Sequence, residues 1–298
     1  MSATQQVLLA VAGSYTPFLW SQSAAPSQAY RRIAVSEDGV VIAATTASDQ
    51  IYVSLDSGES WTARASNQVW SCISMSEDGS VMMAGTEGGK IWVSTDYGQN
   101  WTGRASSGLW TGITVSSDGT KAAASEYLLK PQLSVDSGAS WSPAADSNGA
   151  WTDIAGSSSG SRLITVGSPD STILSIDSGS SWLRKDNARD WAGVALSSDG
   201  LKIAAIVNGG KIYTASGDFF FGFTERYEER PWRRIASSAD GNRLVAIDTG
   251  PELHFSSDSG VSWRPVAVRG EWQDAAFHGA EGSIFAISDD AIFIGMGV

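Results

Sequence analysis

Residues 51–61 read IYVSLDSGESW and residues 91–101 read IWVSTDYGQNW, so one turn pattern, Ser-x-Asp-x-Gly-x-x-Trp, follows a similar short apolar run twice. The pattern returns at residues 134–141, 175–182 and 256–263. Its closing tryptophans are Trp61, Trp101, Trp141, Trp182 and Trp263, and the steps between the first four are 40, 40 and 41 residues. The last step spans two periods. One copy is therefore degenerate, within SGDFFFGFTERYEER at residues 216–230, where Phe223 stands at the tryptophan position.

A second series of aromatic residues has the same period. Each member opens a segment such as WTGITVSSDG, and the members are Tyr30, Trp70, Trp110, Trp151, Trp191, Trp232 and Trp272. Within a unit, apolar runs of four to six residues alternate with turn signals such as Glu77-Asp78-Gly79 and Glu87-Gly88-Gly89. Short runs bounded by glycine turns favour strands over helices. Four short strands per period of about 40 residues predict the blades of a β-propeller.

The predicted fold is all-β, a single seven-bladed β-propeller of four-stranded blades spanning residues 1–298. The repeats start near residues 30, 70, 110, 151, 191, 232 and 272, and residues 1–29 form an N-terminal extension. The unit after Trp272 has room for only three strands. Trp20 lies 41 residues before Trp61, at the position of a closing tryptophan. We therefore expect Phe18–Ser21 to supply the outer strand beside residues 291–295 and close the ring, which leaves no open edge.

The aspartates of the turn pattern have a mechanical explanation. An aspartate in such a turn accepts hydrogen bonds from turn amides, and the tryptophan pins the hairpin against the neighbouring sheet. We expect a structural role for Asp56, Asp96, Asp136, Asp177 and Asp258. Carboxylates one repeat apart cannot converge on one ion, so no metal site is expected among them.

The five intact turns make the chain similar to the Asp-box, or BNR, repeat family over nearly its whole length. That family includes sialidases, sortilin-type receptors, photosystem II assembly factors, and bacterial and phage surface proteins. The resemblance implies a propeller fold and leaves the function open, because a fold does not determine a chemistry.

Residues that directly follow the opening aromatics are expected at the mouth of the central channel. They include four arginines and two aspartates, namely Arg31, Arg32, Arg233, Arg234, Asp153 and Asp274. Guanidinium groups converging there would hold the carboxylate of an anion or a sugar acid. The alternative is a channel lined by compensating charges, with Arg–Asp pairs across it.

A sialidase-like glycoside hydrolase is the enzyme hypothesis. The resemblance to that family implies an arginine triad, a Tyr–Glu pair and an acidic aspartate. Here Arg32-Ile33-Ala34 departs from the family's Arg-Ile-Pro motif, and Tyr227 with Glu228 or Glu229 is the adjacent Tyr–Glu candidate. No spacing marks a second carboxylate. His254 and His278 stand alone in the sequence, so we expect no catalysis, metal or cofactor.

Composition narrows the class of partner. Lys+Arg total 20 against 32 Asp+Glu, a net charge of −12, which argues against nucleic acids and anionic membranes. No apolar run could span a membrane, and no Lys or Arg precedes the apolar residues 7–13, so a secretory signal is not expected. Cys72 is the single cysteine and excludes an internal disulfide. The opening segment resembles the N-termini of some phage virion-appendage proteins.

These observations favour a non-enzymatic binding or structural propeller that contacts a protein or a glycan at a virion or cell surface. A sialidase-like hydrolase and a scaffold similar to the photosystem II assembly factors are the alternatives. The sequence leaves the localisation open.

The degenerate turn adds one further candidate. Phe219, Phe220 and Phe221 replace the small residues of an intact turn. An exposed apolar patch usually marks a contact surface, so these residues are predicted to form a protein–protein or self-association contact. The alternative is local packing against Tyr227 and Pro231.

Overall fold

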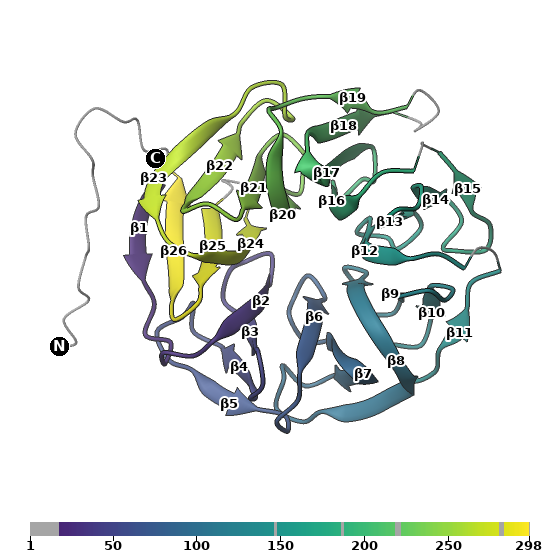
Figure 1. Cartoon of the computed structure of the whole chain (residues 1–298). Coiled ribbons are helices and arrows are strands. Elements are labelled where there is room, and N and C mark those ends of the chain that lie inside the picture. Colours follow the sequence, from purple (N-terminus) through teal and green to yellow (C-terminus); the bar gives the residue numbers. More distant parts are fainter. Residues whose placement is uncertain (1–17, 146–147, 186–187, 218–221, 280–282, 298) are drawn as a thin grey trace.

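The computed structural model describes residues 18–145, 148–185, 188–217, 222–279 and 283–297. Every regular element in these ranges is a β-strand, and the strands form a ring around an open centre (Figure 1). Short apolar strands separated by glycine-containing turns therefore produce the all-β propeller that the sequence predicts.

The strands of the first half of the chain are β1 (Phe18–Gln22), β2 (Tyr30–Val35), β3 (Ile42–Thr46), β4 (Ile51–Ser54), β5 (Thr62–Arg64), β6 (Trp70–Met75), β7 (Met82–Ser94), β8 (Thr102–Val115), β9 (Ala122–Glu126), β10 (Gln132–Ser134), β11 (Ser142–Pro143), β12 (Trp151–Gly156) and β13 (Leu163–Gly167). Those of the second half are β14 (Ile173–Ser175), β15 (Leu183–Arg184), β16 (Trp191–Leu196), β17 (Lys202–Gly210), β18 (Ile212–Ser216), β19 (Thr224–Glu225), β20 (Arg230–Ser237), β21 (Leu244–Asp248), β22 (Glu252–Ser256), β23 (Arg264–Arg269), β24 (Trp272–His278), β25 (Ser283–Ser288) and β26 (Ile292–Gly297).

The prediction of seven four-stranded blades is wrong. The described strands pair into five sheets, three of four strands, one of six and one of eight. The six-stranded sheet arises because β7 continues through the predicted turn at Glu87-Gly88-Gly89 and β8 runs from one repeat into the next. The eight-stranded sheet arises because β17 also pairs with β20, through Asn208–Pro231 and Gly210–Arg230. Hydrogen bonding thus joins neighbouring repeats that the sequence pattern separates.

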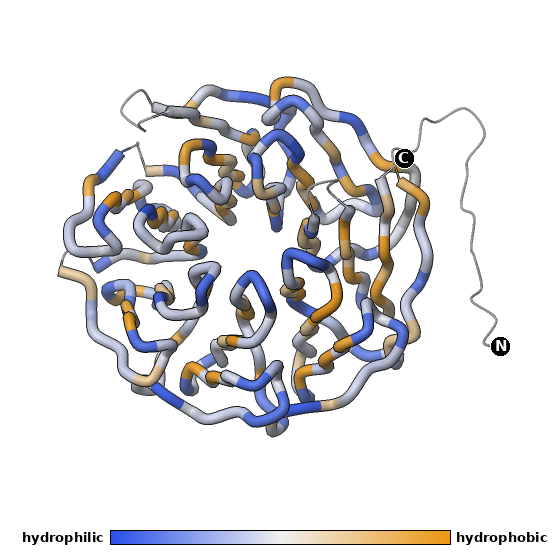
Figure 2. The backbone as a smooth tube through the Cα atoms, turned by 180° about the vertical axis from the view of Figure 1, so that it is seen from behind, coloured by the Kyte–Doolittle hydropathy of each residue, from blue (hydrophilic) through white to orange (hydrophobic). Residues whose placement is uncertain are grey.

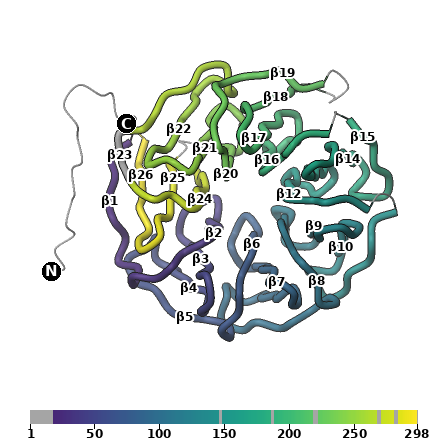
Figure 3. The backbone as a smooth tube through the Cα atoms, viewed as in Figure 1, coloured from purple at the N-terminus to yellow at the C-terminus, as the bar shows by residue number. Residues whose placement is uncertain are grey.

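The predicted closure by the N-terminal segment is confirmed. Strand β1 pairs antiparallel with β26, from Phe18 opposite Gly297 to Gln22 opposite Phe293, so the purple and yellow ends of the chain lie side by side (Figure 3). The Phe18 ring meets the Phe255 ring edge-on at 5.0 Å, and the Trp20 ring lies 6.0 Å from that of Trp272. The closing strand is therefore held by side-chain packing as well as by backbone pairing.

The core is divided into clusters that each join two neighbouring repeats. One cluster packs Ala43, Ile51 and Val53 of the first repeat against Trp70 and Met82 of the second. All seven opening aromatics are almost fully buried in such positions. In Figure 2 the orange apolar stretches lie within the sheets, and much of the blue lies in the loops. Each repeat is therefore stabilised mainly by its neighbours, as in other repeat proteins.

Two kinds of turn lie on the same face of the ring, because the first and third strands of a repeat run in the same direction. We call this face the turn face and the opposite one the mouth face. In the outer turn, the amide of Gly58 donates to Ser54 Oγ at 2.9 Å and the amide of Ser60 donates to Asp56 Oδ1 at 2.8 Å. The same bonds recur at Asp96, Asp136, Asp177 and Asp258. The structure thus places these aspartates within their own turns.

The inner turns are linked to one another around the ring. Ser76 Oγ donates to Asp78 Oδ1 at 2.6 Å and accepts from the amide of Val81 at 3.0 Å. Six backbone hydrogen bonds of 2.7–3.0 Å connect successive inner turns, for example from the amide of Glu37 to the carbonyl of Glu77. The turn face is therefore stabilised by backbone contacts between repeats.

The degenerate repeat keeps the position of the closing aromatic residue. The Phe223 ring packs 5.3 Å from the Trp191 ring, as the Trp101 ring packs 6.5 Å from the Trp70 ring in an intact repeat. The prediction that Phe223 replaces the tryptophan is confirmed. Phe219, Phe220 and Phe221 lie outside the described residues.

Candidate functional site

Each repeat has a β-bulge directly after its opening aromatic. The register between the first two strands shifts there in all seven repeats, for example between Tyr30 and Arg32 and between Trp232 and Arg234. A bulge places one extra residue opposite its partner strand and changes the direction of that side chain. The extra residues are Arg31, Ser71, Thr111, Thr152, Ala192, Arg233 and Gln273.

All seven bulged residues line one cavity of about 790 Å³ on the mouth face, which we call the mouth cavity. Arg32 and Arg234 also line it, so the structure brings together the four arginines that the sequence singled out. Leu109 and Tyr127 add exposed apolar surface to the same wall. The cavity therefore combines cationic, hydroxyl and apolar groups with the carboxylates of Glu87 and Asp190, a composition suited to an extended polar ligand.

The arginines of the mouth cavity are poorly neutralised. Arg31 forms an ion pair with Glu87 at 2.9 Å. Arg32 and Arg234 instead donate from Nη1 to the carbonyl oxygens of the residues before them, each at 2.8 Å. Arg233 donates to the amide oxygen of Gln273 at 3.2 Å. Among the described residues no carboxylate forms an ion pair with Arg32, Arg233 or Arg234. The charge of Arg32 acts on Asp153 and Asp274, so the guanidinium groups of Arg233 and Arg234 are the ones that remain available to an anion.

Asp153 and Asp274 lie between neighbouring repeats, outside the wall of the mouth cavity. Asp153 accepts from the amides of Ile154 at 2.9 Å and Val194 at 3.1 Å, and Asp274 accepts from those of Ala275 at 3.0 Å and Ile33 at 3.2 Å. Each carboxyl group thus connects its own repeat to the next. Among the described residues no ion pair joins an arginine of the mouth cavity to Asp153 or Asp274, but the charge of Arg32 acts on both carboxyl groups, so these charges compensate in part.

Burial dominates the electrostatics of these two carboxyl groups. Each side chain keeps some accessible surface, but loss of solvation raises the pKa of Asp153 to about 7 and that of Asp274 to about 6. Amide hydrogen bonds and the charge of Arg32 oppose both shifts. Near neutral pH Asp153 therefore carries only part of its charge, whereas Asp274 is mostly ionised.

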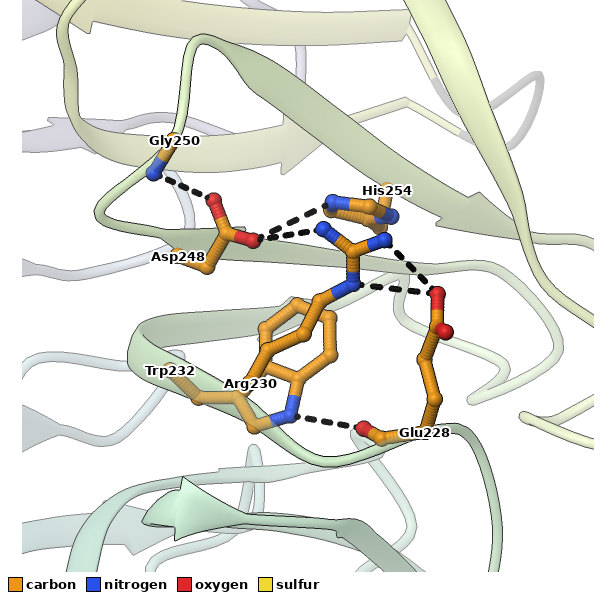
Figure 4. Close-up of polar contacts among 6 residues, drawn as sticks. All are labelled: Glu228, Arg230, Trp232, Asp248, Gly250 and His254. Carbon is orange, nitrogen blue, oxygen red and sulfur yellow. Dashed lines mark hydrogen bonds and ion pairs between the residues drawn. The ribbon is translucent and has the colours of Figure 1, made fainter.

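Glu228 of the candidate Tyr–Glu pair lies in a polar and aromatic cluster just before β20 (Figure 4). Glu228 accepts from Arg230 at 2.7 Å, and Arg230 also contacts the buried Asp248 at 3.1 Å. Behind them, burial lowers the pKa of His254, whose Nε2 lies 3.6 Å from Asp248.

Tyr227 itself faces the aromatic part of this cluster. Its ring stacks on Trp263 at 5.8 Å and lies 5.9 Å from the ring of Trp232. The structure therefore uses Tyr227 for packing and directs Glu228 toward Arg230. Neither residue lines the mouth cavity.

The described part of the chain offers neither a candidate metal site nor a membrane-spanning helix. No group of three or more His, Cys, Asp and Glu side chains there could hold a metal ion. Cys72 is buried, and burial raises the pKa of its thiol to about 11. The ranges described contain no helix of the length and apolar character needed to cross a membrane.

Sequence reasoning missed part of the mouth cavity. Glu87 in β7, Leu109 in β8, Asn208 in β17 and Tyr127 directly after β9 line it where the repeat pattern predicts loops after the second and fourth strands. The strand order places those loops on the mouth face, so the signal was present in the topology. The side chains that turn inward depend on the bulges and on local pairing.

Comparisons with known proteins show the fold and no family. Neither the models of protein families nor the curated proteins contain a match. Among solved structures, YCF48 bound to a D1 peptide superposes with a TM-score of 0.73 at 17% identity, covering 96% of this chain and 98% of that one. An ancestral GH74 enzyme has a TM-score of 0.73 at 14% identity, covering 94% of this chain and 46% of that one. The β-propeller domain of Myceliophteria thermophila Cps50 (Swd1) also has 0.73 at 14%, with 92% and 98% covered.

Proposed function

We propose that this chain is a binding propeller without catalytic activity, and that its mouth cavity holds an acidic segment of a partner protein. The observation that carries the proposal is the set of four arginines that line the mouth cavity, of which Arg233 and Arg234 form no ion pair with a carboxylate of the described chain. The chain as a whole carries a net charge of −12. A local concentration of cations in an acidic protein would attract a segment of opposite charge.

The shape of the cavity favours a peptide over a small ion. Its volume of about 790 Å³ exceeds what a single carboxylate fills, and Leu109 and Tyr127 offer apolar contacts beside the arginines. YCF48, a neighbour in fold, has been solved with a D1 peptide bound. A scaffold similar to the photosystem II assembly factors is the second candidate function, and it would use the same peptide-binding cavity. The repeated turns support assignment to the Asp-box propellers, and a virion or cell surface is the setting we propose.

The test measures binding of fluorescent peptides by anisotropy. A series of ten-residue peptides with zero to four acidic residues should bind more tightly as the acid count rises, and more weakly at high salt. The double variant Arg32→Gln, Arg234→Gln should lose about tenfold or more, since each charge-assisted bond contributes roughly 1.5–3 kcal/mol. Arg243→Gln removes one charge on the turn face and should leave binding unchanged.

Two outcomes would overturn the proposal. Equal peptide binding by the double variant and the wild type would show that Arg32 and Arg234 do not contact the peptide. Binding of a carboxylated sugar with no binding of any acidic peptide would replace the protein partner by a glycan. Catalysis is tested with a fluorogenic sialoside, where we expect no turnover. Turnover that disappears in Tyr227→Phe would establish the hydrolase instead.

A further inference from the structure

Two grooves on the turn face occupy equivalent places in the ring. One is lined by Lys121, Leu133 and Ser178, and the other by Lys202, Thr214 and Ser259. The paired positions differ by 81 in each case (202 − 121, 214 − 133 and 259 − 178), which is two repeats. Each lysine Nζ contacts the serine Oγ of the next repeat, at 3.2 Å for Lys121 and 3.4 Å for Lys202. The two grooves are therefore the same structural element in different sequence contexts.

Their volumes differ greatly. The groove beside Lys121 holds about 10 Å³, whereas the groove beside Lys202 holds about 360 Å³. In the first, the Leu133 side chain packs directly against Gly179. In the second, the shorter Thr214 takes that place opposite Gly260. The regular turn that follows Leu133 is replaced after Thr214 by the degenerate stretch. A leucine in the first groove and a threonine in the second thus accompany the difference in volume.

The polar side chains of the open groove are cationic and hydroxylic. Lys202 and Arg226 line it together with Thr214, Ser216, Thr224, Ser237 and Ser259, and with apolar residues such as Ile203, Leu244 and Val261. None of the described residues that line it is Asp or Glu. Arg226 is half-buried, and its Nε donates to Thr214 Oγ1 at 2.8 Å. In the ranges described, no carboxylate forms an ion pair with Arg226. Its remaining guanidinium donors are therefore not neutralised by an acid.

Among the described residues, nearby aspartates compensate the charge of Lys202, and none forms an ion pair with Arg226. The charge of Lys202 contributes to lowering the pKa values of Asp199 and Asp240, which belong to the adjacent inner turns. Neither aspartate lines the groove. Arg226 enters from the other side, after β19, and keeps its charge within a wall of hydroxyl groups.

We propose that this groove is a second binding site, for the oxyanion of a phosphorylated or sulfated sugar. A guanidinium group and an ammonium group in one cavity without a carboxylate suit a tetrahedral oxyanion. The five hydroxyl side chains suit the hydroxyl groups of a sugar. A volume of about 360 Å³ lies within the range of small-ligand sites, and an inorganic ion alone would leave much of it empty. The site is on the opposite face from the mouth cavity and does not depend on the function proposed for that cavity.

The experiment is calorimetric titration of the full chain at low salt with four probes: a hexose phosphate, a hexose sulfate, the unmodified hexose and inorganic phosphate. The phosphate or the sulfate ester should bind, inorganic phosphate more weakly, and the neutral hexose not measurably. The ester that binds identifies the source of the oxyanion. Arg226→Gln should weaken ester binding about tenfold or more. Lys121→Gln, which removes a positive charge from the closed groove, should leave it unchanged.

A closing variant provides a second, independent measurement. Thr214→Leu introduces the residue that fills the equivalent groove, so it should abolish ester binding while the melting temperature stays within a few degrees of the wild type. Binding that persists in both Arg226→Gln and Thr214→Leu would overturn the site. So would the absence of binding by either ester to the folded wild type, or an equal loss in Lys121→Gln. An equal loss in Lys121→Gln would mean that the overall positive charge of the turn face, and not this groove, attracts the ester.

Discussion

The mouth face and the turn face of this ring are built in different ways. On the turn face the inner turns repeat a serine–aspartate contact, for example Ser76 with Asp78, and join one another through backbone hydrogen bonds. On the mouth face the same backbone geometry, a bulge after each opening aromatic, presents a different side chain in nearly every repeat. Arg31, Ser71 and Ala192 occupy equivalent positions there.

The difference separates stability from recognition. Backbone contacts between turns recur regardless of side chain, so one face can keep the ring together. Bulged side chains contribute little to the strand pairing, so the other face is free to vary and to carry function. Changes on the turn face should therefore alter stability, and changes on the mouth face should alter binding.

The largest effect on stability is expected from removal of β1, the strand that closes the ring and supports both faces. Deletion of residues 1–22 removes β1, exposes the edge of β26 and takes away Phe18 and Trp20. Burial of two large side chains contributes about 3–5 kcal/mol, so the variant should melt far lower or aggregate. Thermal melting and light scattering measure both. Deletion of residues 1–17 alone keeps β1 and is the control. A monomeric 1–22 deletion of unchanged stability would refute closure by this strand.

A matched pair of glycines compares the faces directly. Gly39, in an inner turn, and Gly88, on the mouth face, both have φ of +72°. A Cβ at Gly39 would overlap the His278 ring, whereas nothing lies within 4 Å of one at Gly88. Gly88→Ala should cost about 1 kcal/mol from backbone strain, and Gly39→Ala about 3 kcal/mol because overlap is added. Chemical denaturation measures both. Equal losses would show that the two faces are packed alike.

A smaller, pH-dependent effect is expected at Asp153. Burial raises its folded pKa to about 7, above its unfolded value, so its contribution to stability is complete below about pH 4 and is lost as pH rises through 7. Asp153→Asn cannot ionise. It should melt lower than the wild type at pH 5 by an amount equal to about 1 kcal/mol, and the gap should narrow by pH 8.

The control for this pH series is Asp136→Asn. Hydrogen bonds from Ser140 are the largest cause that lowers the pKa of Asp136, to about 2, so its carboxylate stays charged from pH 5 to 8. The melting gap of that variant should be constant across the series. A constant gap for Asp153→Asn as well would contradict the raised pKa.

The smallest effect on stability is expected from the mouth arginines. Arg234→Gln removes a bond to an adjacent carbonyl, and Arg32→Gln also removes a charge that acts on Asp153 and Asp274. The free energy of unfolding should therefore change by less than about 1 kcal/mol. Denaturant titration on the same samples used for peptide binding measures it. A loss of several kcal/mol would mean that these residues support the ring, which would remove the distinction between the faces.

The sequence predicts the elements better than their connections. The regular series of Trp and Asp residues predicts short strands, the closing role of Trp20 and the replacement by Phe223, because each follows from position within a repeat. The merging of repeats into larger sheets depends on hydrogen bonds between β7 and β8 and between β17 and β20, which the repeat pattern does not contain.

For the candidate site, too, the sequence predicts which residues take part better than it predicts how they pair. The position after each opening aromatic predicts which arginines reach the mouth cavity. The separation of Asp153 and Asp274 from them depends on the bulge and on amides of the next repeat, such as that of Val194. The residue pattern predicts which charged side chains lie at the same height along the axis of the ring. Which group each of them contacts depends on the three-dimensional packing.

The pairing of β1 with β26 also has a consequence in time. Phe18 and Gly297, which are opposite each other, are 279 positions apart (297 − 18). Contacts between such distant positions form slowly, because a long loop must be closed before any of them is gained. During synthesis, earlier repeats can fold on one another as they emerge, but β1 has no partner until nearly the whole chain has been made. Closure is therefore expected as the last and slowest step of folding. Until it occurs, the backbone edge of the first repeats remains open to other chains.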